Sequence, residues 1–174
     1  MTSKHHSASS TLVRDVMSKT YQTCLDTDPI SVVIDLMPHN KDRAILVLDS
    51  QQQLVGIVTE SNLTPHREKI PHLRGDEGDF RLYLWGYEVD SLDNAIAQAI
   101  SSGLTVGQAL KRQSKVYTAS PADKLEDVLY LIDKQNIRRI PVVENDKVVG
   151  LLTYRDVFEY EARLARALLG PEQG

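Results

Sequence analysis

The sequence predicts a mixed α/β fold, of the α+β kind, that consists of two copies of one β-α-β-β-α unit. An internal repeat carries this prediction: residues 54–63 match residues 148–157, with a glycine, a threonine and an Asn or Asp each recurring 94 positions later. An apolar run and a polar turn precede each glycine, which indicates strand, turn and strand. One such unit is too small to cover its own sheet, so we expect the two copies to pack against each other.

The first copy should contain two helical turns, a short strand, a helix and a pair of strands. These elements are expected in order at residues 13–17, 24–25, 31–41, 44–48 and 54–58. Asp28-Pro29 opens the helix, and Pro38 should end or kink it because the proline ring clashes with the preceding turn.

The second copy should repeat this order and finish with a longer helix. Its elements are expected as helical turns at 106–110, a β-prone piece at 116–118, a helix that begins after Ser120-Pro121, strands at 140–143 and 148–152, and a helix from Tyr154 towards Leu169. Apolar residues at helical spacing mark the last helix, namely Val157, Phe158, Leu164, Ala165 and Leu168. Gly170-Pro171 stops it.

An insert of about forty residues, 64–103, separates the two copies. Its sequence predicts a loop over 64–78, a strand over 80–84 and a helix over 91–100 that ends at Gly103. Trp85 lies among acidic residues, between Tyr83 and Tyr87. Two interpretations remain open for this acidic aromatic segment: an edge of the core, or a docking surface for a basic partner.

The composition excludes several classes of protein. With 174 residues, 41% hydrophobic and 25% charged, the chain is neither a mini-protein nor wholly disordered. A net charge of −4 argues against a nucleic-acid binder. No apolar run approaches the ~18 residues of a membrane span, and the polar N-terminus lacks a secretory signal, so we expect a soluble cytoplasmic protein. The single cysteine, Cys24, cannot form an internal disulfide, and its redox role stays open.

The repeated Thr-x-x-Asn/Asp motif has a purely structural interpretation. A threonine directly after a strand suits a helix N-cap, where its hydroxyl satisfies a free amide. An aspartate three residues later lies in the first helical turn, where the helix dipole favours it. A cap alone would therefore explain this motif.

The chain nevertheless resembles the cystathionine-β-synthase (CBS) domain family, through Gly-apolar-apolar-Thr-x-x-Asp after the strand Ile140-Pro141-Val142-Val143. Two copies resemble a stand-alone paired module, the Bateman module. The resemblance implies a first domain at 11–63, the insert at 64–103, a second domain at 104–160, and a C-terminal helix extension and tail at 161–174. It further implies pseudo-two-fold symmetry, a disc-like homodimer, no catalysis, and clefts for AMP, ADP, ATP or S-adenosylmethionine.

The resemblance also implies a binding role for individual residues of the second copy. Asp156 would bind the ribose hydroxyls and Thr153 the ribose or phosphate. The residues implied to hold adenine are Ile140, Pro141, Tyr117 and Thr118, and those implied to face phosphate are Arg138, Arg139 and Arg155.

In the first copy, the corresponding site residues are Thr59, Asn62 and Arg43. Asn62 carries no charge and Leu46 replaces the proline of the strand, so we expect this cleft to bind more weakly or to stay empty.

The sequence leaves three candidate functions. The first is an adenine-nucleotide sensor, as in energy sensing, that passes occupancy to an unidentified protein target. The second is a structural dimerisation module with vestigial clefts. The third, an enzyme with its site in 64–103, is the weakest because that segment lacks a base, nucleophile and orienting group. His66 and His72 lack a third ligand, so no metal site is expected.

Overall fold

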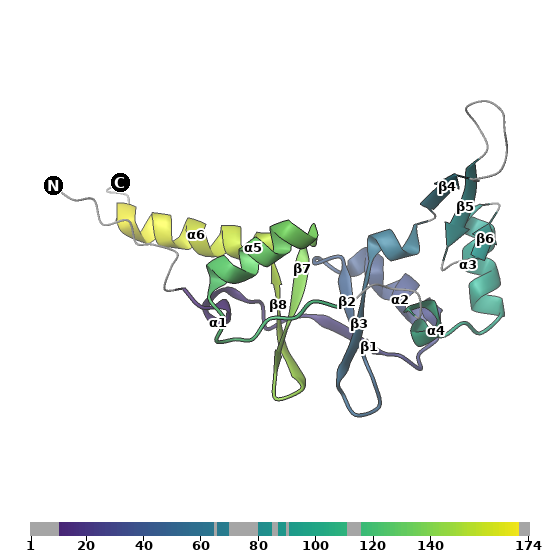
Figure 1. The fold of residues 1–174 in the computed structure, drawn as a ribbon, viewed down its shortest axis with the longest axis horizontal. Helices are drawn as coiled ribbons and strands as arrows, with labels where there is room; N and C mark the ends of the chain where they lie inside the picture. The colour runs from purple at the N-terminus through teal and green to yellow at the C-terminus, as the bar shows by residue number, and fades with distance from the viewer. Residues whose placement is uncertain are drawn as a thin grey trace. The chain divides into compact units, whose positions relative to one another are not determined.

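The structure, a computed structural model, describes residues 11–64, 66–69, 80–84, 87–89, 91–110 and 116–170 (Figure 1). The chain divides into two units, each with its own core. Unit 1 joins Met1–Tyr21 to Tyr117–Gly174, and unit 2 is Gln22–Val116. The boundaries of the units therefore differ from those of the sequence copies, because the leading segment of each copy belongs to the unit formed by the other copy.

Unit 2 contains the strands of the first copy. Its first sheet has the order β1-β2-β3, formed by Gln22–Leu25, Ala44–Leu48 and Leu54–Thr59. β1 is parallel to β2, and β2 is antiparallel to β3. All five residues of β2 are buried, as its apolar sequence predicts for a central strand.

Helix α2 of unit 2, Ile30–Leu36, is shorter than the predicted span of 31–41. A 3-10 turn, Met37–His39, continues it and contains Pro38. The predicted effect of this proline is confirmed, because the regular helix ends two residues before it. After Thr59, the chain makes only another 3-10 turn, η3, over Glu60–Leu63.

The insert forms a second sheet and a helix in unit 2. The sheet has the order β4-β5-β6, from His66–Lys69, Phe80–Leu84 and Tyr87–Val89. The strand predicted at 80–84 is confirmed, whereas the loop predicted over 64–78 was wrong where β4 pairs with β5. Helix α3, Leu92–Ser101, is confirmed with Ser91 as its N-cap. Trp85, residues 70–79 and the side chains of Tyr83 and Tyr87 lie outside the described residues.

Unit 1 contains the hairpin of the second copy. β7, Arg139–Glu144, pairs with β8, Lys147–Thr153, and the predicted helices are confirmed as α5, Leu125–Gln135, and α6, Tyr154–Leu169 (Figure 1). The strand predicted at 116–118 was wrong, since these three residues are in no strand and the next described pairing partner of β7 is the single parallel bridge of Ala119 with Val142.

The leading segment of each sequence copy packs in the unit formed by the other copy. Helix α1, Val13–Val16, buries Val13 and Val16 among core residues of unit 1 such as Leu125. Backbone hydrogen bonds fix it there, with Val13 donating to Asp123 O at 3.0 Å and Leu125 donating to Thr11 O at 2.9 Å.

Helix α4, Val106–Leu110, makes the reciprocal exchange in unit 2. It buries Val106 in the core formed by β1, α2 and β2. The Ile30 amide donates to Leu104 O at 2.8 Å, and the Val106 amide donates to Asp28 O at 2.9 Å. Each core is therefore completed by a segment distant in the sequence.

The recurring glycine is where the exchanged segment approaches the hairpin. Ser18 and Leu151 exchange two backbone hydrogen bonds of 2.9 Å, beside Gly150. A β-carbon on Gly150 would lie 2.6 Å from Met17 Sδ and 3.0 Å from Ser18 O. One on Gly56 would lie 2.6 Å from Leu110 Cδ1. A side chain at Gly150 would push the exchanged backbone away, whereas one at Gly56 would require the side chain of Leu110 to move.

Candidate functional site

The second Thr-x-x-Asp motif forms a capping box at the start of α6. The Thr153 amide and its hydroxyl both donate to Asp156 Oδ2, at 2.8 and 2.7 Å. In return, Thr153 Oγ1 accepts from the Asp156 amide at 3.3 Å. Because Thr153 is only 7% exposed, this buried network holds the Asp156 carboxylate in one orientation.

The second carboxylate oxygen of Asp156 remains available. All hydrogen bonds of this carboxylate within the described chain use Oδ2, so Oδ1 has none. Asp156 is half-buried at the first turn of a 16-residue helix, whose N-terminus carries positive potential. The motif therefore presents a fixed, open, anionic acceptor.

The strand register brings the apolar candidates to the same hairpin. Arg139 pairs with Thr153, and Ile140 pairs with Leu152. Ile140 and Pro141 are both buried, and the Pro141 carbonyl already accepts from the Ala119 amide at 3.0 Å. Since proline has no N–H and its carbonyl already accepts one hydrogen bond, Pro141 can offer a ligand its apolar ring but no backbone donor.

Tyr117 and Thr118 lead into the segment that pairs with β7. The Tyr117 hydroxyl donates to Gln135 Oε1 at 2.7 Å, which anchors the ring against α5, while Thr118 is exposed. Nothing in the sequence pattern indicated Gln135, because 18 residues separate it from Tyr117.

A second tyrosine, Tyr154, joins the start of α6 to α5. Its hydroxyl donates to Asp133, and this hydrogen bond raises the pKa of Tyr154 above its ordinary value, with desolvation and the carboxylate charge acting in the same direction. Sequence reasoning missed this contact as well, since its partners are 21 residues apart.

The three arginines of the second copy differ in whether they already have a partner within the chain. Arg155 Nε donates to Glu159 Oε1 at 3.0 Å, an exposed pair one helical turn apart. Arg139 is half-buried and takes part in an interaction. Arg138 is exposed and makes neither a hydrogen bond nor an ion pair with any residue that the structure describes. Arg138 is thus the arginine most available to an anion.

In the first copy, the side-chain amide of Asn62 takes the place that the Asp156 carboxylate has in the second copy. The Thr59 amide donates to Asn62 Oδ1 at 2.7 Å, and the Thr59 hydroxyl donates to the same oxygen at 3.1 Å. The Asn62 oxygen is therefore committed, and the open group of this side chain is the Nδ2 donor. Arg43 forms an ion pair with Glu60, so the guanidinium of the first copy already has a carboxylate partner.

The described residues contain no reactive thiol, no cluster of metal-ligating side chains and no membrane-spanning helix. Burial raises the pKa of the Cys24 thiol to about 11, with the Asp28 carboxylate adding to the rise, so the thiol stays protonated at neutral pH. Within the described ranges, no three His, Cys, Asp or Glu side chains gather into a metal cluster. Among the described helices, none has the length and apolar character needed to cross a membrane.

The chain matches known proteins over both copies. Residues 13–67 and 100–163 match the CBS domain. The uncharacterized protein MJ1426 of Methanocaldococcus jannaschii is 28% identical over 160 residues, which cover 85% of this chain and 89% of that protein. The mitochondrial CBS domain-containing protein CBSX3 of Arabidopsis thaliana is 25% identical over 158 residues, which cover 85% of this chain and 63% of the relative.

Solved structures share the fold. CBSX2 in complex with AMP has a TM-score of 0.62 and 22% identity, and the match covers 89% of this chain and 98% of that one. The CBS domain pair of MJ0100, in complex with 5'-methylthioadenosine and S-adenosyl-L-methionine, has a TM-score of 0.58 and 21% identity over 88% of this chain and 98% of that one. The predicted fold class is confirmed, and the chain belongs to the CBS domain family, with two CBS domains in tandem.

Proposed function

We propose that this protein is a non-catalytic regulatory module that binds an adenine-containing ligand at Thr153 and Asp156 and passes its occupancy to a partner protein. AMP, ADP, ATP and S-adenosylmethionine are the candidate ligands. The observation that carries the proposal is the open Oδ1 of Asp156 on a carboxylate held in place by the cap. The AMP, 5'-methylthioadenosine and S-adenosyl-L-methionine complexes of proteins with this fold support the ligand class.

The chemistry of Asp156 fits a ribose. A carboxylate oxygen can accept from vicinal hydroxyls, and its bonds are charge-assisted. Because the cap fixes the carboxylate before ligand arrives, little side-chain entropy is lost on binding. The N-terminus of α6 and Arg138 would favour a phosphate or another anionic group.

The remaining candidates of the second copy have supporting roles. Tyr117, Thr118, Ile140 and Pro141 would contact the adenine, and Pro141 would do so without a backbone donor. Arg139 and Arg155 are weaker phosphate candidates, because both already take part in interactions.

The first copy should bind more weakly. Asn62 has its oxygen committed to the cap, and Arg43 is paired with Glu60. A ligand at Thr59 and Asn62 would meet no open anionic acceptor, and it would compete with Glu60 for Arg43.

Calorimetric titration tests both the binding of nucleotide at Asp156 and the weaker binding at Asn62. With AMP, ATP and S-adenosylmethionine tried separately, we expect one of them to fill one dominant site per chain. Two equal and independent sites would contradict the inequality of the two motifs. No binding of any of the three would favour the second candidate, a structural dimerisation module, which the capping role of Asp156 also accommodates.

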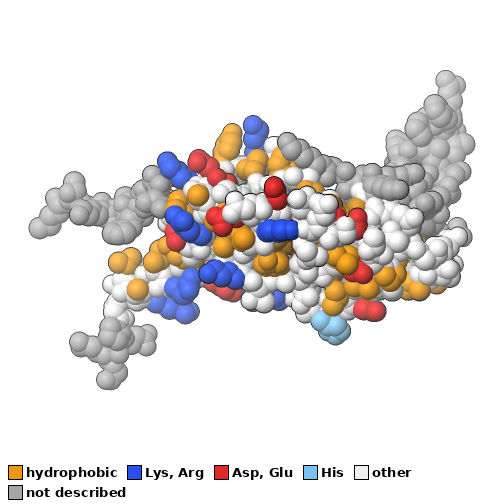
Figure 2. Space-filling view, turned by 90° about the horizontal axis from the view of Figure 1, so that it is seen from below, with side chains coloured by type: hydrophobic (Ala, Val, Ile, Leu, Met, Phe, Trp, Pro, Cys, Tyr) orange, Lys and Arg blue, Asp and Glu red, His pale blue; other side chains and the backbone are white. Residues whose placement is uncertain are grey.

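We also propose that the protein is a homodimer, because α6 leaves an apolar surface uncovered. Val157 and Tyr160 pack against the core of unit 1, but Phe158 is 73% exposed and Leu168 is 82% exposed. Figure 2 shows hydrophobic side chains exposed among basic ones on the face it draws. A second copy of α6 would cover these side chains.

Light scattering at micromolar concentration should give twice the chain mass of 19.5 kDa. The substitution Phe158→Glu should shift the mass towards the monomer, because it places a charge in the interface. Glu161→Ala, on the same exposed helix, should not. A mass near 19.5 kDa for the unsubstituted protein, with and without nucleotide, would refute the dimer.

A further inference from the structure

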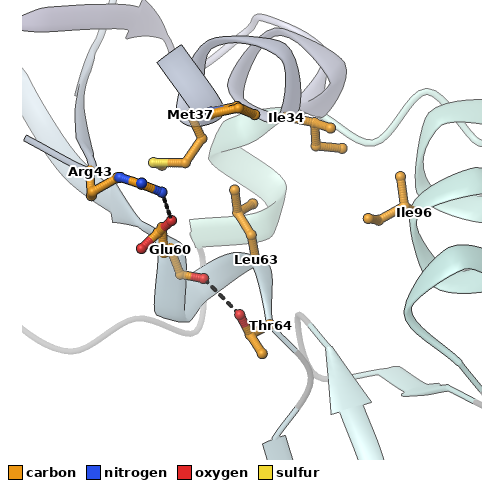
Figure 3. A pocket seen from close by; sticks show the side chains of 8 residues that line it. Ile34, Met37, Arg43, Glu60, Leu63, Thr64 and Ile96 are labelled. Carbon is orange, nitrogen blue, oxygen red and sulfur yellow. Dashed lines mark hydrogen bonds and ion pairs between the residues drawn. The ribbon is translucent and has the colours of Figure 1, made fainter. Parts of the chain in front are cut away.

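Unit 2 contains a cavity of about 420 Å³ whose lining does not include Thr59 or Asn62 (Figure 3). Its volume is within the range of about 300–1,000 Å³ typical of small-molecule sites. The lining residues are Ile34, Met37, Pro38, Arg43, Glu60, Leu63, Thr64 and Ile96.

The walls of the cavity are mostly apolar and come from four elements, one of which is the 3-10 turn that contains Met37 and Pro38. Ile34 comes from α2, Leu63 from η3 and Ile96 from α3, and Figure 3 shows the side chain of Leu63 between the Arg43–Glu60 pair and Ile96. In unit 1, Val157 and Tyr160 of the long α6 pack on the core, whereas the corresponding turn of unit 2 stops at Leu63. The insert helix α3 therefore supplies a wall that the repeated unit itself does not contain.

Two opposite charges lie at the edge of this apolar space. Arg43 and Glu60 are the charged residues among those that line it, and they form an ion pair. Their side chains are 50% and 53% exposed, so water screens the pair and its opening costs little. The Thr64 hydroxyl donates to the Glu60 carbonyl oxygen at 3.0 Å, which ties the chain at the cavity's edge.

We infer that this cavity is a binding site for a small zwitterion with an apolar body, of the class of free α-amino acids with apolar side chains. Such a ligand would insert between Arg43 and Glu60, with its carboxylate on the guanidinium and its ammonium on the carboxylate. Its side chain would lie among Ile34, Leu63 and Ile96. The ligand thus restores both charge partners that it separates.

Ligands with one charge fit less well. An anion on Arg43 would lie beside the displaced Glu60 carboxylate, and a cation on Glu60 would lie beside the displaced guanidinium. Each case forms one charge-assisted hydrogen bond where the zwitterion forms two, and adds repulsion from a like charge. A nucleotide phosphate has the same difficulty, which separates this cavity from the site proposed at Asp156.

Amide chemical-shift titration of the full chain with L-leucine, L-methionine and L-phenylalanine tests the inference. We expect saturable shifts with at least one of them. For leucine, the matched probes are 4-methylpentanoate, which lacks the ammonium, and 3-methylbutylamine, which lacks the carboxylate. Each should bind at least about tenfold more weakly than the zwitterion, as expected for loss of a charge-assisted hydrogen bond.

Substitutions in and beside the cavity test whether the amino acid binds there. Ile96→Trp should fill the cavity and abolish the saturable shifts, while Ile100→Trp should leave them unchanged, since Ile100 is on the same helix, 48% exposed and not part of the lining. Arg43→Gln and Glu60→Gln should each weaken binding at least about tenfold. Asp156→Asn should not affect it.

Three results would overturn the inference. They are the absence of saturable binding by all three amino acids, equal binding of the single-charge analogues, and binding that survives Ile96→Trp. Urea unfolding of each variant establishes that it is folded. Because nucleotide binding at Asp156 is measured separately, failure here is distinguishable from failure of the proposed function.

Discussion

Replacing Asp156 with asparagine should weaken adenine-nucleotide binding by about 1.5–3 kcal/mol, or roughly tenfold or more, the range for hydrogen bonds that involve a charged group. Asparagine should keep the cap, because Asn62 makes the corresponding bonds to Thr59 in the first copy. With its amide oxygen committed to Thr153, the variant would present a donor where Asp156 presents Oδ1. The substitution therefore removes the acceptor and retains the helix start.

Asp156→Ala is the less selective change. It removes the ligand acceptor, and it also leaves the Thr153 amide without its partner in a buried position, which should lower the free energy of unfolding by about 1–3 kcal/mol. Calorimetry and urea unfolding on both variants separate the two effects. If Asp156→Asn binds nucleotide as tightly as the unsubstituted protein, Asp156 has no part in the site and the cap alone accounts for the motif.

Replacing Gly150 with alanine should destabilise the protein by about 1–3 kcal/mol, the usual cost of overpacking. The new β-carbon would lie 2.6 Å from Met17 Sδ, which can move, and 3.0 Å from Ser18 O, which cannot move without straining the two hydrogen bonds between Ser18 and Leu151. The expected result is a lower urea midpoint with an unchanged slope.

Gly56→Ala is the matched control for Gly150→Ala. Its nearest contacts are all with the flexible side chain of Leu110, so a rotamer change can relieve the clash. We expect a smaller loss of stability than at Gly150. Equal losses for the two alanine variants would show that the backbone contact at Ser18 is not what limits the side chain at Gly150.

The sequence was informative where a local pattern fixes a local structure. The apolar spacing that begins at Leu125 and the stop at Gly170 gave α5 and α6, and Pro38 marked the end of α2. The threonine cap was also readable, since its partners are three residues apart. Each of these features depends on neighbours within a few residues.

Features that depend on distant partners were not predictable. Val13 and Val106 open segments of similar apolar pattern, so nothing local says which core each will join. The pairing of Arg43 with Glu60 spans 17 residues and left no periodic signal. β4 has a charged sequence, and only its pairing with β5 makes it a strand.

The exchange of leading segments has a consequence for how the protein can be divided. A fragment cut at the sequence repeats would separate Val13 and Val16 from the core they complete, and the same cut would separate Val106 from the core around Ile30. The repeat is thus a unit of sequence without being a unit of folding. A minimal fragment that contains the Asp156 motif must therefore also contain residues 11–21. One way to make it is to replace residues 22–116 with a short linker that joins Tyr21 to Tyr117.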